Sequence, residues 1–136
     1  MTRLETPSMA RLDHPRRVAA FPFAETIDIS EAGVTPEEPS PCLGSATAVW
    51  YLLDPPEPGT MTIDLVGSTP SDAVVRLYRC SRDARDRLEF LGCASLVWNG
   101  QLSLEAEMKS DDYLLAQVGT SESRVGSIVV RIERRL

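Results

Sequence analysis

The sequence predicts an all-β fold, an antiparallel jelly-roll-like β-sandwich of about eight strands with an extended N-terminal arm. The first observation behind this prediction is alternation: in Thr60–Val66 every second residue is apolar, as in a strand with one buried face. The second is that such segments are separated by groups of turn-forming residues, for example Pro55–Gly59 and Asn99–Gly100. Short strands at close spacing along one chain are typical of a sandwich or jelly roll.

The predicted strands cover most of the chain after the first twenty residues. They are Ala20–Ile29, Ala48–Asp54, Thr60–Val66, Ala73–Arg79, Arg87–Gly92, Gln101–Ala106, Tyr113–Val118 and Ser127–Glu133. A further short strand at Ser95–Trp98 would lead into the Asn99–Gly100 turn. Alternation predicts the inward-facing positions, with polar residues on a wet outer face; they are Met61, Ile63, Leu65, Leu102, Leu104, Ala106, Leu114, Ala116, Val118, Ile128, Val130 and Ile132. We also expect Trp50 to anchor the core from a central strand.

Length and charge bound the organisation of the chain. Its 136 residues predict one domain, divided into an arm (residues 1–17) and a sandwich (residues 18–136). The arm has no strand or helix period and is net basic, whereas residues 18–40 contain acidic residues and no basic residue. Opposite charge predicts that the arm contacts an acidic protein surface, such as residues Glu25 to Glu38 of another copy, through Arg3, Arg11, Arg16 and Arg17.

The whole chain has a net charge of −6, which argues against nucleic acid as the main partner. The sequence contains no apolar run of the ~20 residues that a membrane helix needs, so no membrane partner is expected. The N-terminal residues also show no apolar segment of signal-peptide length.

Three cysteines, an odd number, favour free thiols over a disulfide framework. A tight hairpin centred on Asp83–Ala84 would place Cys93 opposite Val74, so a Cys80–Cys93 bridge would need another register. The alternatives of thiols and a Cys80–Cys93 bridge stay open. No Cys-x-x-Cys motif exists and the single histidine, His14, lies in the arm, so no bound metal and no cofactor is predicted.

No catalytic residue is predicted. Serine or cysteine hydrolases need a nucleophile with a nearby base, and here the single histidine lies in the arm and no Gly-x-Ser-x-Gly motif occurs. Asp54, Asp64 and Asp72 are candidate calcium ligands by residue type, but they lack Asp-x-Asp spacing and are predicted to be scattered surface residues.

Two other groups of residues are candidates for binding. Trp98, beside the Asn99–Gly100 turn, is expected to be exposed and to anchor a ligand or protein partner. Together with Trp50, Tyr51 and Tyr113 it could form a platform that stacks on a sugar ring. The arginine-rich segment alternates with acidic residues and is predicted to be a solvated hairpin tip with local ion pairs, with a contact patch for an acidic neighbour as the alternative. Its arginines are Arg76, Arg79, Arg82, Arg85 and Arg87.

The order of these signals resembles the bacterial pre-peptidase C-terminal domain family, whose members are jelly-roll sandwiches. The matching features are Pro36–Cys42, Val49-Trp50-Tyr51, Pro58-Gly59, Gly67-Ser68, Asp72, Leu77-Tyr78, Tyr113–Gly119 and Gly126–Ile132. The family often has an acidic pair after the cysteine that Cys93 resembles, where this chain has Ala94-Ser95-Leu96. The resemblance implies an accessory domain of a secreted hydrolase or an appended domain of a phage tail or virion protein.

Together these observations predict a non-enzymatic structural or accessory protein of a virion-like assembly, such as a head-decoration or tail-associated protein. It would act by protein–protein contacts, with other virion proteins or with copies of itself, through its sandwich surface and its arm. The alternative is a carbohydrate- or surface-binding module of a secreted bacterial protein. The expected location is therefore the virion, or in the alternative the extracellular space.

Overall fold

The computed structural model describes most of the predicted sandwich, namely residues 15–31, 33–34, 47–54, 58–81, 89–95, 100–109, 112–120 and 125–135. In these residues it contains strands, one 3₁₀ turn at Ile29–Glu31 and no α-helix. None of their segments is a helix long and apolar enough to cross a membrane. The strands are β1 (Arg16–Val18), β2 (Phe23–Asp28), β3 (Gly33–Val34), β4 (Thr47–Leu53), β5 (Gly59–Asp64), β6 (Ala73–Ser81), β7 (Glu89–Ser95), β8 (Ser103–Met108), β9 (Asp112–Thr120) and β10 (Ser127–Arg135).

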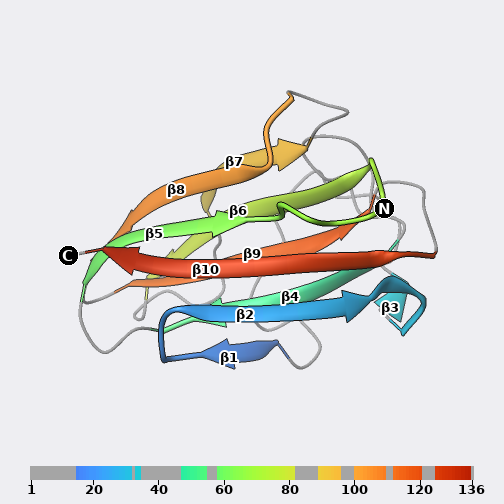
Figure 1. The fold of residues 1–136 in the computed structure, drawn as a ribbon. Coiled ribbons are helices and arrows are strands. Elements are labelled where there is room, and N and C mark those ends of the chain that lie inside the picture. Colours follow the sequence, from blue (N-terminus) through green and yellow to red (C-terminus); the bar gives the residue numbers. More distant parts are fainter. Residues whose placement is uncertain are drawn as a thin grey trace, which may run out of the picture.

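The strands form two sheets connected as a jelly roll (Figure 1). The four-stranded sheet has the order β2-β10-β5-β8, and the six-stranded sheet has the order β1-β4-β9-β6-β7 with β3 also paired to β4. When β1 and β3 are set aside, the remaining strands taken in chain order occupy positions 1-8-3-6 and 2-7-4-5, and all their neighbours are antiparallel. This connectivity confirms the predicted all-β jelly-roll sandwich.

The inner faces of the two sheets enclose one apolar core, and the predicted alternation supplies most of it. Nine predicted inward residues are buried in this core: Met61, Ile63, Leu65, Leu114, Ala116, Val118, Ile128, Val130 and Ile132. The three from β8 and its approach, Leu102, Leu104 and Ala106, are partly buried against it. The prediction for Trp50 is wrong, because its neighbour Tyr51 faces the core and Trp50 packs on the opposite side of the sheet. Burial of each large apolar side chain in this core contributes roughly 1.5–3 kcal/mol to the free energy of unfolding.

The end of the predicted arm is part of the sandwich. Arg16–Val18 form β1, which pairs in parallel with the Tyr51–Leu53 portion of β4. Val18 is 3% exposed and lies in the core, and its carbonyl accepts a hydrogen bond of 2.9 Å from the backbone N–H of Asp54. Residues 16 and 17 therefore belong with the sandwich, while residues 1–14 lie outside the described residues.

The register of the β6–β7 hairpin differs from the prediction. Cys93 lies opposite Arg76 rather than Val74, and Cys80 pairs with Tyr113 of β9. One cause is a bulge between Leu77 and Tyr78, where the pairing shifts by one residue. Strand β7 also continues through Cys93 to Ser95, where the prediction placed the start of a separate short strand, whereas Trp98 lies outside the described residues.

Candidate functional site

The open side of the sandwich between β1 and β2 is closed by an edge cluster of Arg16, Glu25 and Tyr51. Glu25 lies between Phe23 and Ile27 on the inward-facing side of β2, so its carboxylate points toward the other sheet. The Tyr51 hydroxyl donates a hydrogen bond of 2.9 Å to Glu25 Oε1. Arg16 reaches the same oxygen from β1 and forms an ion pair with it. The cluster therefore joins the two sheets at their edge.

Tyr51 is the buried member of the edge cluster. Its side chain is fully buried and its ring packs edge-on against Phe23 with centroids 5.9 Å apart. Burial raises the pKa of the Tyr51 phenol well above its usual value, and the hydrogen bond and negative charge of Glu25 add to that rise while Arg16 opposes it. The neutral phenol is thus the form that this site stabilises.

Arg17 makes the second ion pair of this edge, with Asp54 at 2.6 Å. The guanidinium is largely exposed, whereas the carboxylate is 8% exposed. Screening by solvent limits such a pair to about 1 kcal/mol. The main effect of both arginines is to fix the position of β1 at the edge of the sheet.

These contacts give two of the predicted arm residues, Arg16 and Arg17, partners within their own chain, while their contact with a neighbouring protein stays a prediction. Arg16 was expected to contact an acidic surface of another copy that includes Glu25, and it contacts Glu25 of its own chain. With Arg16 and Arg17 engaged within the chain, residues 1–14 retain two arginines, Arg3 and Arg11, against two acidic residues. Arg3 and Arg11 lie outside the described residues.

The outer face of the four-stranded sheet is polar and exposed, and we call it the wet face. Its side chains alternate with the core residues along each strand, and they include Thr26, Thr60, Thr62, Asp64, Ser103, Glu105, Glu107, Arg131, Glu133 and Arg135. Arg135 pairs with Glu105 at 2.7 Å, and Arg131 lies 3.8 Å from Asp64. In the described residues this face carries no aromatic side chain.

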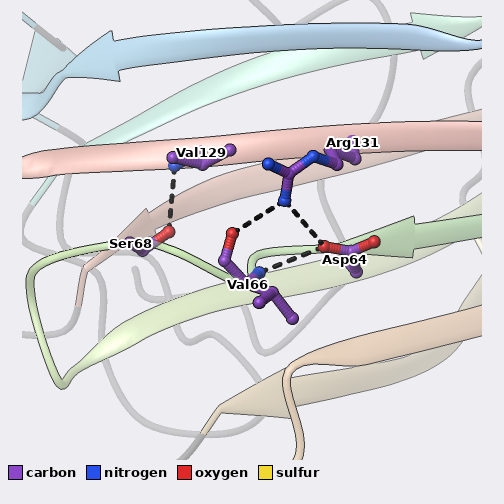
Figure 2. Close-up of polar contacts among 5 residues, drawn as sticks. All are labelled: Asp64, Val66, Ser68, Val129 and Arg131. Atoms are coloured by element: carbon purple, nitrogen blue, oxygen red, sulfur yellow. Dashed lines mark hydrogen bonds and ion pairs between the residues drawn. The ribbon is translucent and has the colours of Figure 1, made fainter.

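The segment after β5 is fastened onto the wet face by side-chain hydrogen bonds (Figure 2). Asp64 Oδ1 accepts a bond of 3.1 Å from the backbone N–H of Val66, and Arg131 donates to the Val66 carbonyl at 3.0 Å. Ser68 Oγ accepts a bond of 2.9 Å from the backbone N–H of Val129. Because β5 pairs with β10 only as far as Asp64 and Arg131, Ser68 supplies the acceptor that a longer strand would have supplied.

The next residue, Thr69, is hydrogen-bonded to Ser127, the first residue of β10. The Ser127 backbone N–H donates to Thr69 Oγ1 at 2.9 Å, and the Thr69 N–H donates to the Ser127 carbonyl at 2.9 Å. Gly126 is required here, because its φ is +127° and a Cβ would lie 2.8 Å from Pro70 Cγ. Val66 and Val125 remain exposed beside these hydrogen-bonded residues.

The outer face of the six-stranded sheet is buried, and we call it the dry face. Cross-strand pairing sets its side chains in rows, one running Leu52–Leu115–Tyr78–Phe90 and the next Trp50–Gln117–Arg76–Cys93. Tyr78, Cys80 and Leu115 form a second apolar cluster against which the side chains of Trp50, Leu52 and Phe90 pack. The sheet is therefore dry on both sides, unlike the four-stranded sheet.

Arg76 is the unexpected member of the dry face. It was predicted to lie in a solvated hairpin tip, and it is 0% exposed. Its guanidinium donates a bond of 3.4 Å to Gln117 Oε1. Burial lowers the pKa of Arg76 and the neighbouring Tyr78 opposes that shift, but an arginine starts so high that it stays charged at any physiological pH.

The tyrosine predicted to stack on a sugar is not available for that role. Tyr113 is 9% exposed and pairs with Cys80 inside the sheet. On the dry face Trp50, Tyr78 and Phe90 lie together across two neighbouring rows, with the ring centroids of Trp50 and Tyr78 5.7 Å apart and those of Tyr78 and Phe90 5.6 Å apart. Trp98 cannot be placed among them, because it lies outside the described residues.

Among the described residues, Cys80, Cys93 and two of the candidate calcium ligands also have defined places. Cys93 is disulfide-bonded, which corrects the expectation of free thiols, and Cys80 is a buried thiol, so the Cys80–Cys93 bridge is absent. Among the described residues no three His, Cys, Asp or Glu side chains gather where a metal could bind. Two of the candidate calcium ligands, Asp54 and Asp64, instead face arginines on different sheets.

Sequence reasoning placed Glu25 and Arg76 in solvent-exposed segments and did not identify the contacts that Glu25, Tyr51 and Arg76 make; Glu25 and Arg76 had a local signal. Glu25 is an acidic residue at an inward-facing position of an alternating strand, and Arg76 interrupts an otherwise apolar run in β6. Charged residues in such positions are rarely buried unless they are paired. The partners of neither residue follow from local sequence: Tyr51 lies 26 positions from Glu25 and Gln117 lies 41 positions from Arg76, while Arg16, nine positions before Glu25, is on a separate strand.

No family model matches the chain, and no curated protein matches it. Among solved structures the chain is similar to a mutant of xylanase 10C from Cellvibrio japonicus in complex with xylopentaose, with 12% sequence identity, a TM-score of 0.38 and 70% of this chain covered. The chain spans 22% of the length of that xylanase chain. A similarity this low does not indicate a shared function, and the resemblance to the pre-peptidase C-terminal domain family stays a prediction.

Proposed function

We propose that this protein is a non-enzymatic structural or accessory protein of a virion-like assembly, such as a head-decoration or tail-associated protein. The observation that carries the proposal is the anchoring of the N-terminal segment as β1. A parallel strand pairing, a buried Val18 and two ion pairs fix residues 16–18 to the edge of the sandwich. In the proposed assembly, residues 1–14 precede this fixed point and contact a neighbouring molecule.

The wet face supplies the second surface for contact. It is a broad β-sheet face whose exposed side chains carry charges of both signs, including Arg131, Glu133 and Arg135 on β10 alone. Interfaces in assemblies use such polar surfaces for register and for excluding wrong partners. Jelly-roll sandwiches occur in viral capsid proteins and in lectins alike, so the fold supports the proposal without deciding it.

The test is deletion of residues 1–14, which leaves β1 and its ion pairs in place. Sedimentation of the native protein in extract from its source should show full-length chain in megadalton particles, and mass spectrometry of those fractions should name its neighbours. The shortened chain should keep its melting temperature and lose particle association. A matched control is Arg3→Ala with Arg11→Ala in the full-length chain, which separates the charge of the segment from its length. Association that survives the deletion contradicts the proposal.

A carbohydrate-binding role is the second candidate, and it has one observation in its favour. Trp50 and Phe90 are half-buried on the dry face, and partly exposed aromatic rings can stack on sugars. Titration of soluble glycans against the intact protein, monitored by tryptophan fluorescence, tests it directly. Saturable binding that Phe90→Ala abolishes would favour this role over assembly, because this variant keeps the tryptophan that reports on binding.

A further inference from the structure

The two outer strands of the four-stranded sheet, β2 and β8, differ in what lies along their free edges. An edge strand presents backbone N–H and C=O groups that a further strand can pair with, and proteins commonly protect such an edge with charges, proline or a bulge. Among the described residues, β8 carries more of this protection than β2. We propose that the free edge of β2 is a docking site for an extended basic segment of another protein, which adds a fifth strand to this sheet.

The backbone groups of Ala24, Thr26 and Asp28 point away from the sheet along this edge. Their direction follows from β10, where the Val129 N–H donates to Ser68 Oγ on the side that faces away from β2 (Figure 2). Because an antiparallel ladder alternates between hydrogen-bonded and non-hydrogen-bonded pairs, Val129 and Thr26 form a non-hydrogen-bonded pair. Ala24 and Asp28 lie two positions from Thr26 and have the same orientation. The side chains of all three residues are exposed.

Strand β2 has few of the features that keep a free edge unpaired. Its ladder with β10 covers all six residues without a bulge, and the strand contains no proline. Ala24 and Thr26 are uncharged. Glu25 points inward, and an unpaired inward charge would oppose an added strand. Its carboxylate is already engaged by the Tyr51 hydroxyl and by Arg16, so no unpaired charge faces the incoming strand.

Strand β8 is better protected. The Leu65 N–H donates to the Leu102 carbonyl at 2.9 Å, just beyond the β5–β8 ladder. Leu102 therefore faces β5, and by alternation the backbone groups of Glu105 and Glu107 face the free side. Arg79 of the opposite sheet donates a hydrogen bond of 2.8 Å to the Glu107 carbonyl and occupies this outward acceptor. The side chains of Glu105 and Glu107 are exposed, so acidic residues flank the rest of this edge.

The opposite sheet extends one strand further than β2. Phe23 and Glu25 of β2 contact Tyr51 of β4, so β2 lies over β4. Strand β1 pairs with β4 on the side away from β9 and therefore lies beyond β2 (Figure 1). No described strand faces β1 at this position, and the Arg16 side chain there is 53% exposed. A strand added to β2 would thus lie over β1 and contact both sheets.

The charges along β2 favour a basic occupant. Asp28 is exposed, and its Oδ1 accepts hydrogen bonds from the backbone N–H and the hydroxyl of Ser30, which hold the carboxylate at this edge. Strand β2 contains no basic residue, and the whole chain has a net charge of −6. A lysine or arginine opposite Asp28 would stabilise the pairing, whereas an acidic residue there would destabilise it. Opposite Ala24 and Thr26, β-branched residues suit the exposed pleated surface.

The probe is the peptide Lys-Val-Thr-Val-Thr-Val-Lys with blocked ends, titrated into the isotope-labelled full-length protein and followed by NMR. We expect saturable shifts of the β2 amides and slower hydrogen exchange at Ala24, Thr26 and Asp28, because their N–H groups gain partners. The same peptide with glutamate in place of lysine should bind about tenfold more weakly. No saturable binding, equal binding of the two peptides, or protection at Glu105 in place of Thr26 would overturn the proposal.

Two matched variants place the site on β2. Thr26→Lys puts a cation beside the free backbone groups and should weaken the peptide about tenfold, with an unchanged melting temperature because Thr26 is exposed. Ser103→Lys makes the same kind of change on the exposed edge of β8 and should leave binding unchanged. Equal effects of the two variants would contradict a site on β2. Protection of Ala24 and Thr26 that appears without peptide and grows with protein concentration would identify a second copy as the occupant, and would overturn the choice of another protein.

Discussion

The dry and wet faces of this sandwich place the same residue type in opposite environments. Arg76 on the dry face is fully buried beside Gln117, whereas Arg131 on the wet face is exposed and contacts Asp64 and the Val66 carbonyl. A buried guanidinium loses its water and is tolerated only when the protein replaces that water with hydrogen bonds and packing. The comparison teaches that the charge of a residue does not tell which face of a sandwich is the surface.

The difference between the faces originates in the strands themselves. In β8 exposed and covered residues alternate, while all nine residues of β9 are buried. Strand β9 is flanked by β4 and β6, so it lies in the interior of its sheet, and its side chains are buried on both faces of that sheet. A partner that meets the described sandwich from solution therefore meets the wet face, the edges and the rim of the dry face.

The largest difference between the faces should appear when both arginines are truncated. Arg76→Ala removes a large buried side chain and a hydrogen-bond partner of Gln117, so we expect a loss of about 3 kcal/mol or more in the free energy of unfolding. Arg131→Ala removes an exposed side chain and should cost less than about 1 kcal/mol. Urea denaturation of both variants measures the two values.

Arg76→Met separates packing from charge at this position. Methionine fills much of the same volume without a charge, so a loss close to that of Arg76→Ala would show that the guanidinium's polar contacts hold the dry face together. Recovery of most of the stability would show that volume matters more. Equal losses for Arg76→Ala and Arg131→Ala would contradict the distinction between the two faces.

The two sheets also differ in how well the sequence predicted which of their residues are buried. Period-two alternation predicted the core positions of β5 and β10 and the polar outer face of their sheet, because a strand with one wet face shows that pattern. Strand β9, with the sequence DYLLAQVGT, is nearly continuously apolar, which is typical of a strand buried on both sides, and the prediction gave it one wet face. The contact of Arg16 with Glu25 and the parallel pairing of Arg16 with Tyr51 depend on tertiary structure, and no local pattern encodes them.

The edge cluster combines both environments, because the Tyr51 side chain is buried while Arg16, which contacts the same Glu25 oxygen, is half-exposed. The folded protein favours the neutral phenol and holds the pKa of Tyr51 above the ordinary value near 10. As the pH rises past about 10, the unfolded chain releases this proton first, so the stability due to Tyr51 is intact below about pH 10 and is lost above it. We expect a loss of about 1.4 kcal/mol per pH unit between pH 10 and the folded-state pKa.

Tyr51→Phe is the matched variant for this experiment. It keeps the ring against Phe23 and removes the ionisable group and the hydrogen bond to Glu25. Stability measured by urea denaturation from pH 8 to pH 11 should fall more steeply for the wild type than for the variant above pH 10, and the two slopes should agree below it. Equal slopes above pH 10 would show that Tyr51 ionises as readily in the folded protein as in the unfolded chain.

The smallest expected effect is on the wet face, where Ser68 and Thr69, in the segment after β5, hydrogen-bond to β10 beyond the end of the β5–β10 ladder. Ser68→Ala removes the acceptor for the Val129 N–H, which should cost about 1 kcal/mol in unfolding free energy and speed hydrogen exchange at Val129. Ser68→Thr keeps a hydroxyl and should restore slow exchange. Asp64→Asn keeps an acceptor for the Val66 N–H and removes only the charge that faces Arg131, so it should change stability by less than Ser68→Ala does, and by still less at high salt. Slow exchange at Val129 in Ser68→Ala would mean that another group satisfies this backbone donor. The wet face would then resemble the dry face in having its backbone protected by burial rather than by one side chain.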